Sequence, residues 1–191
     1  MAPTLTECMN RCCCWLPMII SVEPPPLSTS NALSPLSSLA SLITPNAFEA
    51  ETLADRAVAG LDALRSELQA IGFAAGLVTS AETMTADTVG RGVFCFDAAE
   101  AARIEHPAVV FEREPNGVGD FIAALSTGLY APGKGLTQRT ARICAALVEL
   151  LERTKTLGLD ELALVQAQAD WTAALDQAAQ ASGTITRVTK A

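Results

Sequence analysis

The chain has 191 residues, of which half are hydrophobic, and its 13 basic and 21 acidic side chains give a formal net charge of −8. This length suits one domain, and the apolar content is ample for a buried core. The acidic balance and an aromatic content of only 5% argue against nucleic acid and anionic membranes as partners.

Residues 1–38 differ in composition from the rest of the chain. Three consecutive prolines begin at Pro24 and a serine-rich run ends at Ser38, with no sustained periodicity between them. The apolar stretch 15–22 is too short to cross a bilayer and lacks the features of a secretory signal. We expect a loosely ordered leader over 1–38, or a misassigned start, joined to a cytoplasmic domain over 39–191.

The cysteines favour a reducing compartment. Four of the six lie within the first fourteen residues, whereas Cys95 and Cys144 stand alone inside apolar segments. A disulfide framework would spread its cysteines along the chain. We expect no metal in the leading cluster, because the adjacent cysteines 12–14 cannot easily share one tetrahedral ion and His106 is the only histidine in the chain.

From residue 39 onward, apolar runs alternate with helical periodicities. The first half of this domain predicts a strand over 39–43, a helix over 47–53, an amphipathic helix over 55–70 ended by Gly72, and a buried strand over 73–78. The second half predicts an edge strand over 88–96, alone or as half of a hairpin, a strand over 107–111, a helix over 119–130 and a long helix over 136–157 ended by Gly158. Residues 162–168 fit a strand or a helix, and their alternation favours a strand; an alanine-rich helix is expected over 173–181.

This alternation favours an α/β domain with a mainly parallel sheet and helices on both faces. In such folds, ligands bind at the carboxyl ends of the strands. Thr44-Pro-Asn46, Thr79-Ser80 and the glycine loop that follows the strand expected over 107–111 all fall at such ends.

That glycine loop is Glu114-Pro-Asn-Gly-Val-Gly-Asp120. Gly117 and Gly119 let the backbone approach a ligand closely, and the first amides of the following helix have no internal partner and lie at the positive end of its dipole. Such a place can hold a phosphate, or the charge that develops as a phosphoryl group moves. Asp120 could accept a proton from an attacking hydroxyl. The alternative is a glycine turn in which Asp120 caps the helix.

Four motifs in this order make residues 39–170 resemble the pyridoxal kinases of the ribokinase-like superfamily. They are Leu42-Ile-Thr-Pro-Asn-Ala-Phe-Glu-Ala-Glu51, Leu77-Val-Thr-Ser80, Pro115-Asn-Gly-Val-Gly-Asp120, and the carboxyl-terminal pair Leu151-Glu-Arg-Thr154 and Glu161-Leu-Ala-Leu-Val-Gln-Ala-Gln168. Related sugar kinases share the glycine–aspartate loop, and many hydroxymethylpyrimidine kinases have cysteine where Asp120 stands.

The resemblance implies phosphoryl transfer from ATP, with Mg²⁺, to the 5′-hydroxyl of pyridoxal. By that likeness, Asp120 would be the base that takes the hydroxyl proton and would also contact the substrate. The amides of Gly117, Val118 and Gly119 would stabilise the moving phosphoryl group. Positioning and charge stabilisation carry most of such a reaction.

The same resemblance places the nucleotide at two further motifs. Asn46 and Glu49 would contribute to the ATP–magnesium site, with Glu49 near the metal, and Thr79 and Ser80 would face the nucleotide phosphates. Each has a structural alternative. In these alternatives, Asn46 forms only a turn, Glu49 is the acid that a helix start favours, and Thr79-Ser80 ends a strand.

One motif is rejected. Gly128-Leu-Tyr-Ala-Pro-Gly-Lys-Gly135 nearly matches a phosphate-binding P-loop, but Gly135 replaces the Ser or Thr that would bind magnesium. The run also follows a helix rather than a strand. We interpret it as a helix–helix connection in which Gly133 ends the first helix.

The chain departs from the family in one respect. In the family, these motifs occupy the carboxyl-terminal half of a longer chain, whose amino-terminal half supplies most of the pyridoxal pocket and the dimer surface. Here residues 1–38 stand in its place, so we expect a ribokinase-like fold without its amino-terminal portion, and a homodimer if the fold is complete. The alternatives are a non-catalytic ATP-binding fragment or interaction protein, and a sugar or hydroxymethylpyrimidine kinase of the same fold.

Overall fold

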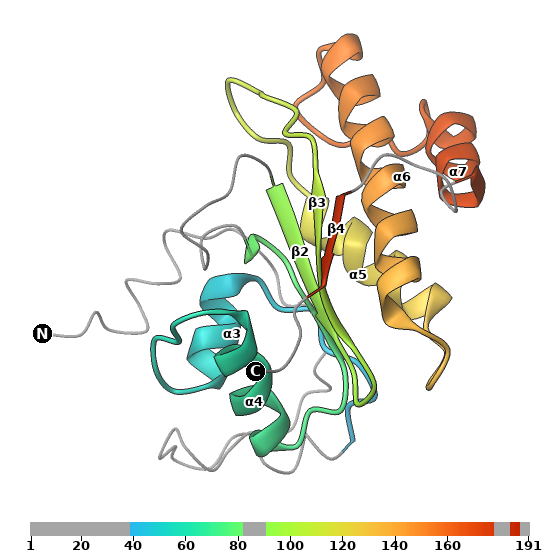
Figure 1. The fold of residues 1–191 in the computed structure, drawn as a ribbon. Helices are drawn as coiled ribbons and strands as arrows, with labels where there is room; N and C mark the ends of the chain where they lie inside the picture. The colour runs from blue at the N-terminus through green and yellow to red at the C-terminus, as the bar shows by residue number, and fades with distance from the viewer. Residues whose placement is uncertain (1–38, 82–90, 178–183, 188–191) are drawn as a thin grey trace, which may run out of the picture.

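The computed structural model describes residues 39–81 and 91–177 and the strand 184–187, arranged as a sheet between two helical layers (Figure 1). The elements in chain order are α3 (Ala47–Leu53), α4 (Leu61–Ile71), β1 (Gly76–Val78), β2 (Arg91–Phe96), β3 (Ala101–His106), α5 (Val118–Leu129), α6 (Leu136–Leu157), α7 (Gln168–Gln177) and β4 (Thr184–Arg187). Within these described residues, no helix is both long and apolar enough to cross a membrane.

The four strands lie in the order β1-β2-β3-β4, and every neighbouring pair among them is antiparallel. This differs from the mainly parallel sheet that we expected. The reason is local, since β2 and β3 are joined by a tight turn at Asp97, and so short a connection can only join antiparallel neighbours. The Asp97 carboxylate accepts the amides of Ala99 and Glu100, both at 2.8 Å, which fixes the turn. β2 therefore forms a hairpin with β3, one of the two expected arrangements, but it is an inner strand of the sheet and not an edge strand.

Parallel pairing occurs along the other side of β1. The Ile43 amide donates to the Ala75 carbonyl at 3.1 Å, and the Thr79 amide donates to the Pro45 carbonyl at 2.9 Å. The strand expected over 39–43 is thus reduced to an extended stretch that borders β1 and runs directly into α3. The carboxyl end of β1 and the start of α3 are placed side by side.

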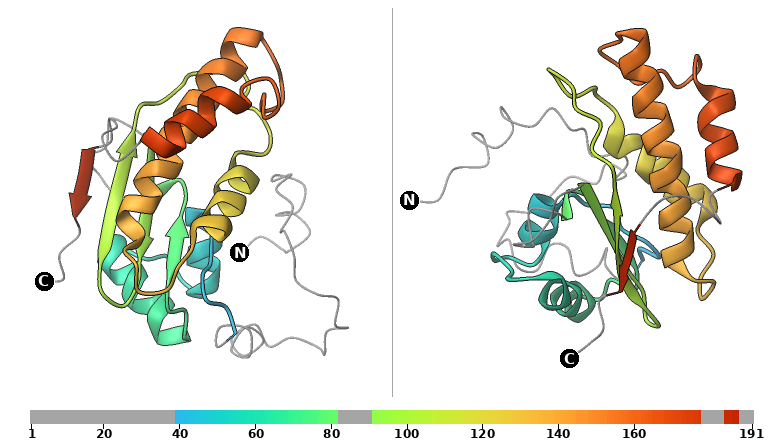
Figure 2. Two further views of the ribbon diagram at one scale, coloured as in Figure 1. Left: turned by 90° about the vertical axis from the view of Figure 1, so that its right-hand side faces the viewer. Right: turned by 45° about the horizontal axis from the view of Figure 1, so that its top comes forward.

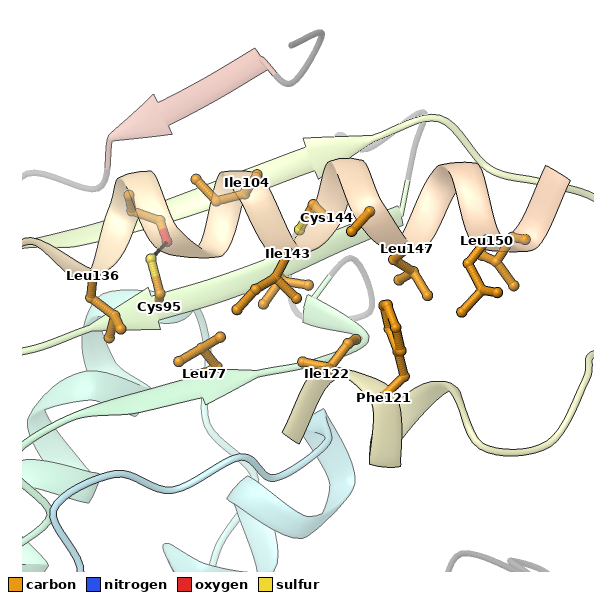
Figure 3. Packing of buried hydrophobic residues seen from close by; sticks show 14 of the residues in the cluster. Leu77, Cys95, Ile104, Phe121, Ile122, Leu136, Ile143, Cys144, Leu147 and Leu150 are labelled. Atoms are coloured by element: carbon orange, nitrogen blue, oxygen red, sulfur yellow. Dashed lines mark hydrogen bonds between the residues drawn. The ribbon is translucent and has the colours of Figure 1, made fainter. Parts of the chain in front are cut away.

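Helices cover both faces of the sheet, as expected. Because side chains alternate along a strand, Val93 and Cys95 of β2 face the layer formed by α5 and α6, whereas Phe94 and Phe96 face α3 and α4. Figure 3 shows the first of these cores, in which Ile143 and other residues of α6 pack over the sheet. The helix α7 lies outside, against α6 (Figure 2).

Two glycines end helices as the sequence predicts. Gly72 (φ 113°) ends α4, and Gly158 (φ 64°) ends α6 in the left-handed conformation that glycine adopts without steric cost. The start of α4 was predicted too early. Asp55 (φ 55°) and Gly60 (φ 92°) have positive φ values, which are incompatible with a continuous helix, so α4 begins at Leu61.

Two expected strands are not strands. Residues 107–111 form an irregular stretch whose Val109 and Phe111 pack against the α5–α6 core, and the strand lies just before it, in β3. Residues 164–167 form turns that lead into α7, which begins at Gln168, earlier than expected. The ends of two other predictions, 88–90 and 178–181, lie outside the described residues.

The rejected P-loop sequence is a helix–helix connection, as expected. However, α5 already ends at Leu129, with Tyr130 as its cap, so Gly133 lies within the connection and does not end the helix. Gly135 precedes the first residue of α6.

Candidate active site

The glycine loop forms the start of α5, as the sequence predicts. Gly117 is the N-cap residue and has φ 93°, and no side chain caps the helix. The first bond of the helix joins the Phe121 amide to the Gly117 carbonyl at 2.9 Å, so the amides of Val118 and Gly119 precede the internal helical bonds. This end of the helix therefore offers backbone donors to an anion.

The two glycines of the loop are required for different reasons. Gly117 needs the positive φ value, which side chains of L-residues rarely adopt. Gly119 lies within the helix, and a Cβ atom added there would meet no protein atom within 4 Å. Packing within the protein does not explain the second glycine. The open space beside it fits a ligand that approaches the backbone closely.

Asp120 does not cap α5, so the alternative in which this residue serves only as a helix cap is wrong. It lies in the first turn of α5 and is exposed, while Gly117 occupies the cap position. Among the described residues, no hydrogen bond or ion pair holds the Asp120 carboxylate, in contrast to that of Glu49. Its oxygens are available to a ligand.

Asp120 borders a groove of about 650 Å³. Its walls are mostly apolar and come from α5, α7 and the segment between α6 and α7; they are formed by Asn116, Gly117, Asp120, Phe121, Ala124, Leu125, Glu161, Leu162, Leu164 and Trp171. The Trp171 ring meets Phe121 edge to face at 5.5 Å, and its Nε1 donates to the Leu164 carbonyl at 3.0 Å. These contacts fix one aromatic wall of the groove.

The carboxyl-terminal motifs hold the glycine loop in place. Asn116 pairs with Glu161 in a parallel bridge. Two residues further on, the Ala163 amide donates to the Thr154 hydroxyl at 3.0 Å, and this hydroxyl donates to the Leu150 carbonyl at 2.7 Å. Sequence reasoning used these motifs only for the resemblance and missed this role. The signal was available, since a Thr late in an apolar helix face needs a partner for its hydroxyl.

A second group of predicted residues gathers where β1 meets α3. Asn46 and Glu49 form a reciprocal capping box, in which Asn46 Oδ1 accepts the Glu49 amide at 2.8 Å and Glu49 Oε2 accepts the Asn46 amide at 2.9 Å. The Thr79 carbonyl accepts the Ala47 amide at 2.9 Å. The structural alternative for Asn46 and Glu49 is therefore realised, and it leaves Glu49 Oε1 outside the capping box.

Ser80 follows at the end of β1 in an unusual conformation. It is exposed and has φ 56°, which is uncommon for a residue other than glycine. Such backbone geometry is often found at ligand sites, where surrounding contacts maintain it.

The predicted residues thus form two groups. The first group lies on the α3–α4 side of the sheet and consists of Asn46, Glu49, Thr79 and Ser80. The second group lies at the start of α5, on the opposite side, and consists of residues 117–120. In the part of the chain that the structure describes, no group of three His, Cys, Asp or Glu side chains could hold a metal ion. A Mg²⁺ ion would depend on phosphate oxygens and water for most of its ligands, as is usual for this ion.

The two thiols whose pKa values are raised, Cys95 and Cys144, lie in the core and belong to neither group of predicted site residues. Burial raises the pKa of Cys95 to about 11, partly offset by hydrogen bonding to Thr140, and burial also raises the pKa of Cys144. The Cys95 thiol donates to the Ala102 carbonyl at 3.4 Å. Such neutral, enclosed thiols are structural and not nucleophilic. His106 ends β3, and its Nδ1 lies 3.1 Å from the Pro107 carbonyl oxygen.

Solved structures define the class of fold. The pyridoxal kinase of Entamoeba histolytica superposes with a TM-score of 0.64 at 22% identity, over 83% of this chain and 55% of that one. The pyridoxal kinase of Leishmania donovani, in complex with ADP and pyridoxine, gives a TM-score of 0.62 at 19% identity, over 84% of this chain and 55% of that one. A Bacteroides thetaiotaomicron protein described as a phosphomethylpyrimidine kinase gives 0.66 at 17% identity, over 83% and 55%. The fold is ribokinase-like, as expected from the resemblance.

Sequence comparison points to one group of kinases within this fold. The chain is 33% identical over 132 residues to pyridoxal kinase PdxY of Rubrobacter xylanophilus, a match that covers 68% of this chain and 45% of the relative. It is 32% identical over 140 residues to pyridoxal kinase PdxY of Deinococcus radiodurans, covering 69% and 47%. The matches fall in the carboxyl-terminal part of these relatives. The chain thus spans about half the length of the curated relatives it matches, and no family model matches it.

Proposed function

We propose that this chain carries the phosphoryl-transfer part of an ATP-dependent pyridoxal kinase. The observation that carries the proposal is the start of α5, where Gly119 has open space beside it and the Asp120 carboxylate is exposed at the edge of a groove. The similarity to pyridoxal kinases at 33% and 32% identity supports this choice of substrate over other alcohols.

In the proposed reaction, ATP is the phosphoryl donor and the 5′-hydroxyl of pyridoxal is the acceptor. Asp120 takes the proton of the hydroxyl as the hydroxyl oxygen attacks the terminal phosphorus of ATP. The bond from that phosphorus to the bridging oxygen breaks, and ADP leaves with its electron pair. The amides of Gly117, Val118 and Gly119 face the charge that spreads over the phosphoryl oxygens. Because these donors are fixed by the backbone of α5, they need no reorganisation during the reaction.

The second group would hold the rest of the nucleotide. Thr79 and Ser80 lie next to the Asn46–Glu49 capping box through the bonds between β1 and the start of α3. We propose that these residues face the phosphates and that Glu49 Oε1 contacts, directly or through water, the Mg²⁺ that enters with ATP. One carboxylate together with substrate phosphates is a common environment for this ion. We also propose that the protein forms a homodimer where the fold is complete.

The proposal is tested on the purified 191-residue chain with ATP, Mg²⁺ and pyridoxal, by measuring pyridoxal phosphate formation, and separately by calorimetric titration with an ATP analogue. The Asp120→Asn variant retains the shape of the side chain but lacks the base. We expect it to lose at least ~100-fold in turnover with nucleotide binding nearly unchanged. Asp62→Asn on α4, an acid at the start of another helix, is the matched control and should retain turnover.

Three outcomes separate the alternatives. Turnover that falls in Asp120→Asn but not in Asp62→Asn supports the kinase. Nucleotide binding without any product shows that this chain is a non-catalytic nucleotide-binding protein, as the half-length match would favour. A folded chain that binds no nucleotide contradicts both. A panel with a sugar and hydroxymethylpyrimidine as acceptors decides between pyridoxal and the other substrates of this fold.

A further inference from the structure

A second cavity lies where the connection between α5 and α6 meets the end of α7. It has a volume of about 320 Å³ and is lined by Lys134, Gln138, Arg139, Arg142 and Asp176. It follows the last residue of α5, whereas the glycine loop precedes the first. It shares no lining residue with the groove beside Asp120. The cavity therefore does not belong to the proposed active site.

The lining of this cavity is net positive, whereas the chain as a whole is net negative. Between Asp120 and Glu149 the sequence contains no acidic residue. The three basic residues in this interval, Lys134, Arg139 and Arg142, all line the cavity. The chain as a whole has a formal net charge of −8. Clustered positive charge in an acidic protein attracts anions locally, and the surrounding acidic surface disfavours large polyanions.

Both arginines are held in place by backbone carbonyls, and Arg142 also donates weakly to Asp176. Arg139 Nη1 donates to the Ala131 carbonyl at 3.0 Å, and Arg142 Nε donates to the Leu175 carbonyl at 2.7 Å. These bonds fix both guanidinium groups against neutral oxygens and leave other donors of each group unused, since a guanidinium has five N–H donors. The side chains are thus ordered in advance of any ligand.

The one carboxylate of the cavity is a weak partner. Asp176 Oδ1 lies 3.4 Å from Arg142 Nη2, and the Asp176 side chain is 81% exposed. An exposed pair of this length contributes little to stability. Lys134 is exposed at the mouth of the cavity, and no ion pair found among the described residues involves it. Asp176 is the only acid in the lining of this cavity. Glu100 lies nearby, where its Oε1 accepts the Thr137 amide at 3.0 Å.

We propose that this cavity binds the phosphate group of a small soluble compound. The planar forks of Arg139 and Arg142 suit two phosphate oxygens each, and Lys134 adds a point charge. Gln138 supplies a neutral donor beside them. This inference does not depend on the proposed kinase function.

The test is a calorimetric titration of the purified 191-residue chain with inorganic phosphate at about 0.15 M NaCl. We expect saturable binding with Kd on the order of 1 mM or tighter. Arg139→Gln and Lys134→Gln should each weaken it by about 10-fold, the effect of losing one charged contact of about 1.4 kcal/mol. Lys134 is exposed, so its variant should fold even if Arg139→Gln does not. Asp176→Asn should strengthen binding severalfold, because a competing acid is removed.

The matched control is Arg153→Gln. Arg153 is another arginine of α6, but it is paired with Asp170 at 3.0 Å and Glu149 at 3.5 Å, so its loss should leave phosphate binding unchanged. Equal weakening in this variant would show a general charge effect and would overturn the proposal. So would the absence of saturable binding, or binding that Gly119→Ala abolishes and Arg139→Gln does not, since phosphate would then lie at the glycine loop.

One further arm separates free phosphate from a lipid headgroup. Sedimentation with vesicles that contain phosphatidic acid should leave the protein in the supernatant. Pelleting that depends on Lys134, without binding of free phosphate, would replace the small compound by a membrane and contradict the proposal.

Discussion

At the scale of single residues, Thr154 controls a contact on which the glycine loop depends. Its hydroxyl is fully buried and joins the Leu150 carbonyl to the Ala163 amide. Thr154→Val has nearly the same shape but leaves the Ala163 N–H buried without an acceptor. We expect the free energy of unfolding to fall by about 1–3 kcal/mol, the cost of such an unmade bond. Urea denaturation measures it.

Two controls accompany Thr154→Val. Thr154→Ser keeps the hydroxyl and should recover most of the loss. Thr156→Val removes an exposed hydroxyl of the same helix, which donates only to the Glu152 carbonyl, and should cost less than about 0.5 kcal/mol. Similar losses in Thr154→Val and Thr156→Val would show that the Ala163 contact contributes nothing specific.

At the scale of elements, the start of α5 should respond differently to its two glycines. Gly117→Ala forces a side chain into φ 93°, and we expect a loss of roughly 1–2 kcal/mol in the free energy of unfolding. Gly119→Ala adds a methyl group in open space within a helix, so stability should be unchanged or raised by up to ~1 kcal/mol. We nevertheless expect Gly119→Ala to weaken nucleotide binding, because the methyl group occupies the ligand's path.

Denaturation and calorimetric titration of both variants separate these effects. Unchanged nucleotide affinity in Gly119→Ala would remove the amides around this residue from the site. The pair thus tests the ligand role of the loop without relying on catalysis.

The elements also show how far the sequence could predict the fold. The long helix α6 and its end at Gly158 follow from periodicity and a terminating glycine. The strand β3 could not be predicted, because Ala101-Ala-Arg-Ile-Glu-His106 is rich in helix formers and only its pairing with β2 makes it a strand. Non-local pairing is invisible to a local pattern.

The segment 162–168 misled for another reason. Its alternation of large apolar residues indicated a strand, but Leu164 and Val165 are exposed, and the buried residues are the small Ala163 and Ala167. Those two are four positions apart, which is helical spacing. The places of the candidate-site residues were easier to predict than the sheet, because these glycine, acid and turn residues occur at element ends that local signals mark. Its support by Thr154 and Glu161 depends on tertiary contacts.

At the scale of the whole molecule, the core between the sheet and α6 contains the buried neutral thiols of Cys95 and Cys144. Because a buried thiol resists ionisation, we expect the free energy of unfolding to fall at high pH. Burial raises the pKa of Cys95 from 9.0 to about 11, so the unfolded chain loses this proton first. The free energy of unfolding should therefore decline between about pH 9 and 11, while the contribution is fully present below pH 9. Urea denaturation across this range, with Cys95→Ala as the reference for other titrating groups, measures the contribution.

The same burial should slow alkylation. At pH 8, iodoacetamide should modify Cys95 and Cys144 much more slowly in the native protein than in urea, as mass spectrometry of the peptides can show. Equal rates in both conditions would mean that this core opens readily.

The bridge between Asn116 and Glu161 has a consequence for biosynthesis. A nascent chain carries the complete glycine motif long before the residues that support it have left the ribosome. Until Glu161 has emerged, the glycine motif cannot form its bridge. A chain released before that point would contain the motif without the contact that supports it. The proposed nucleotide site would then form late in translation, and a ligand that binds only the folded form would stabilise it.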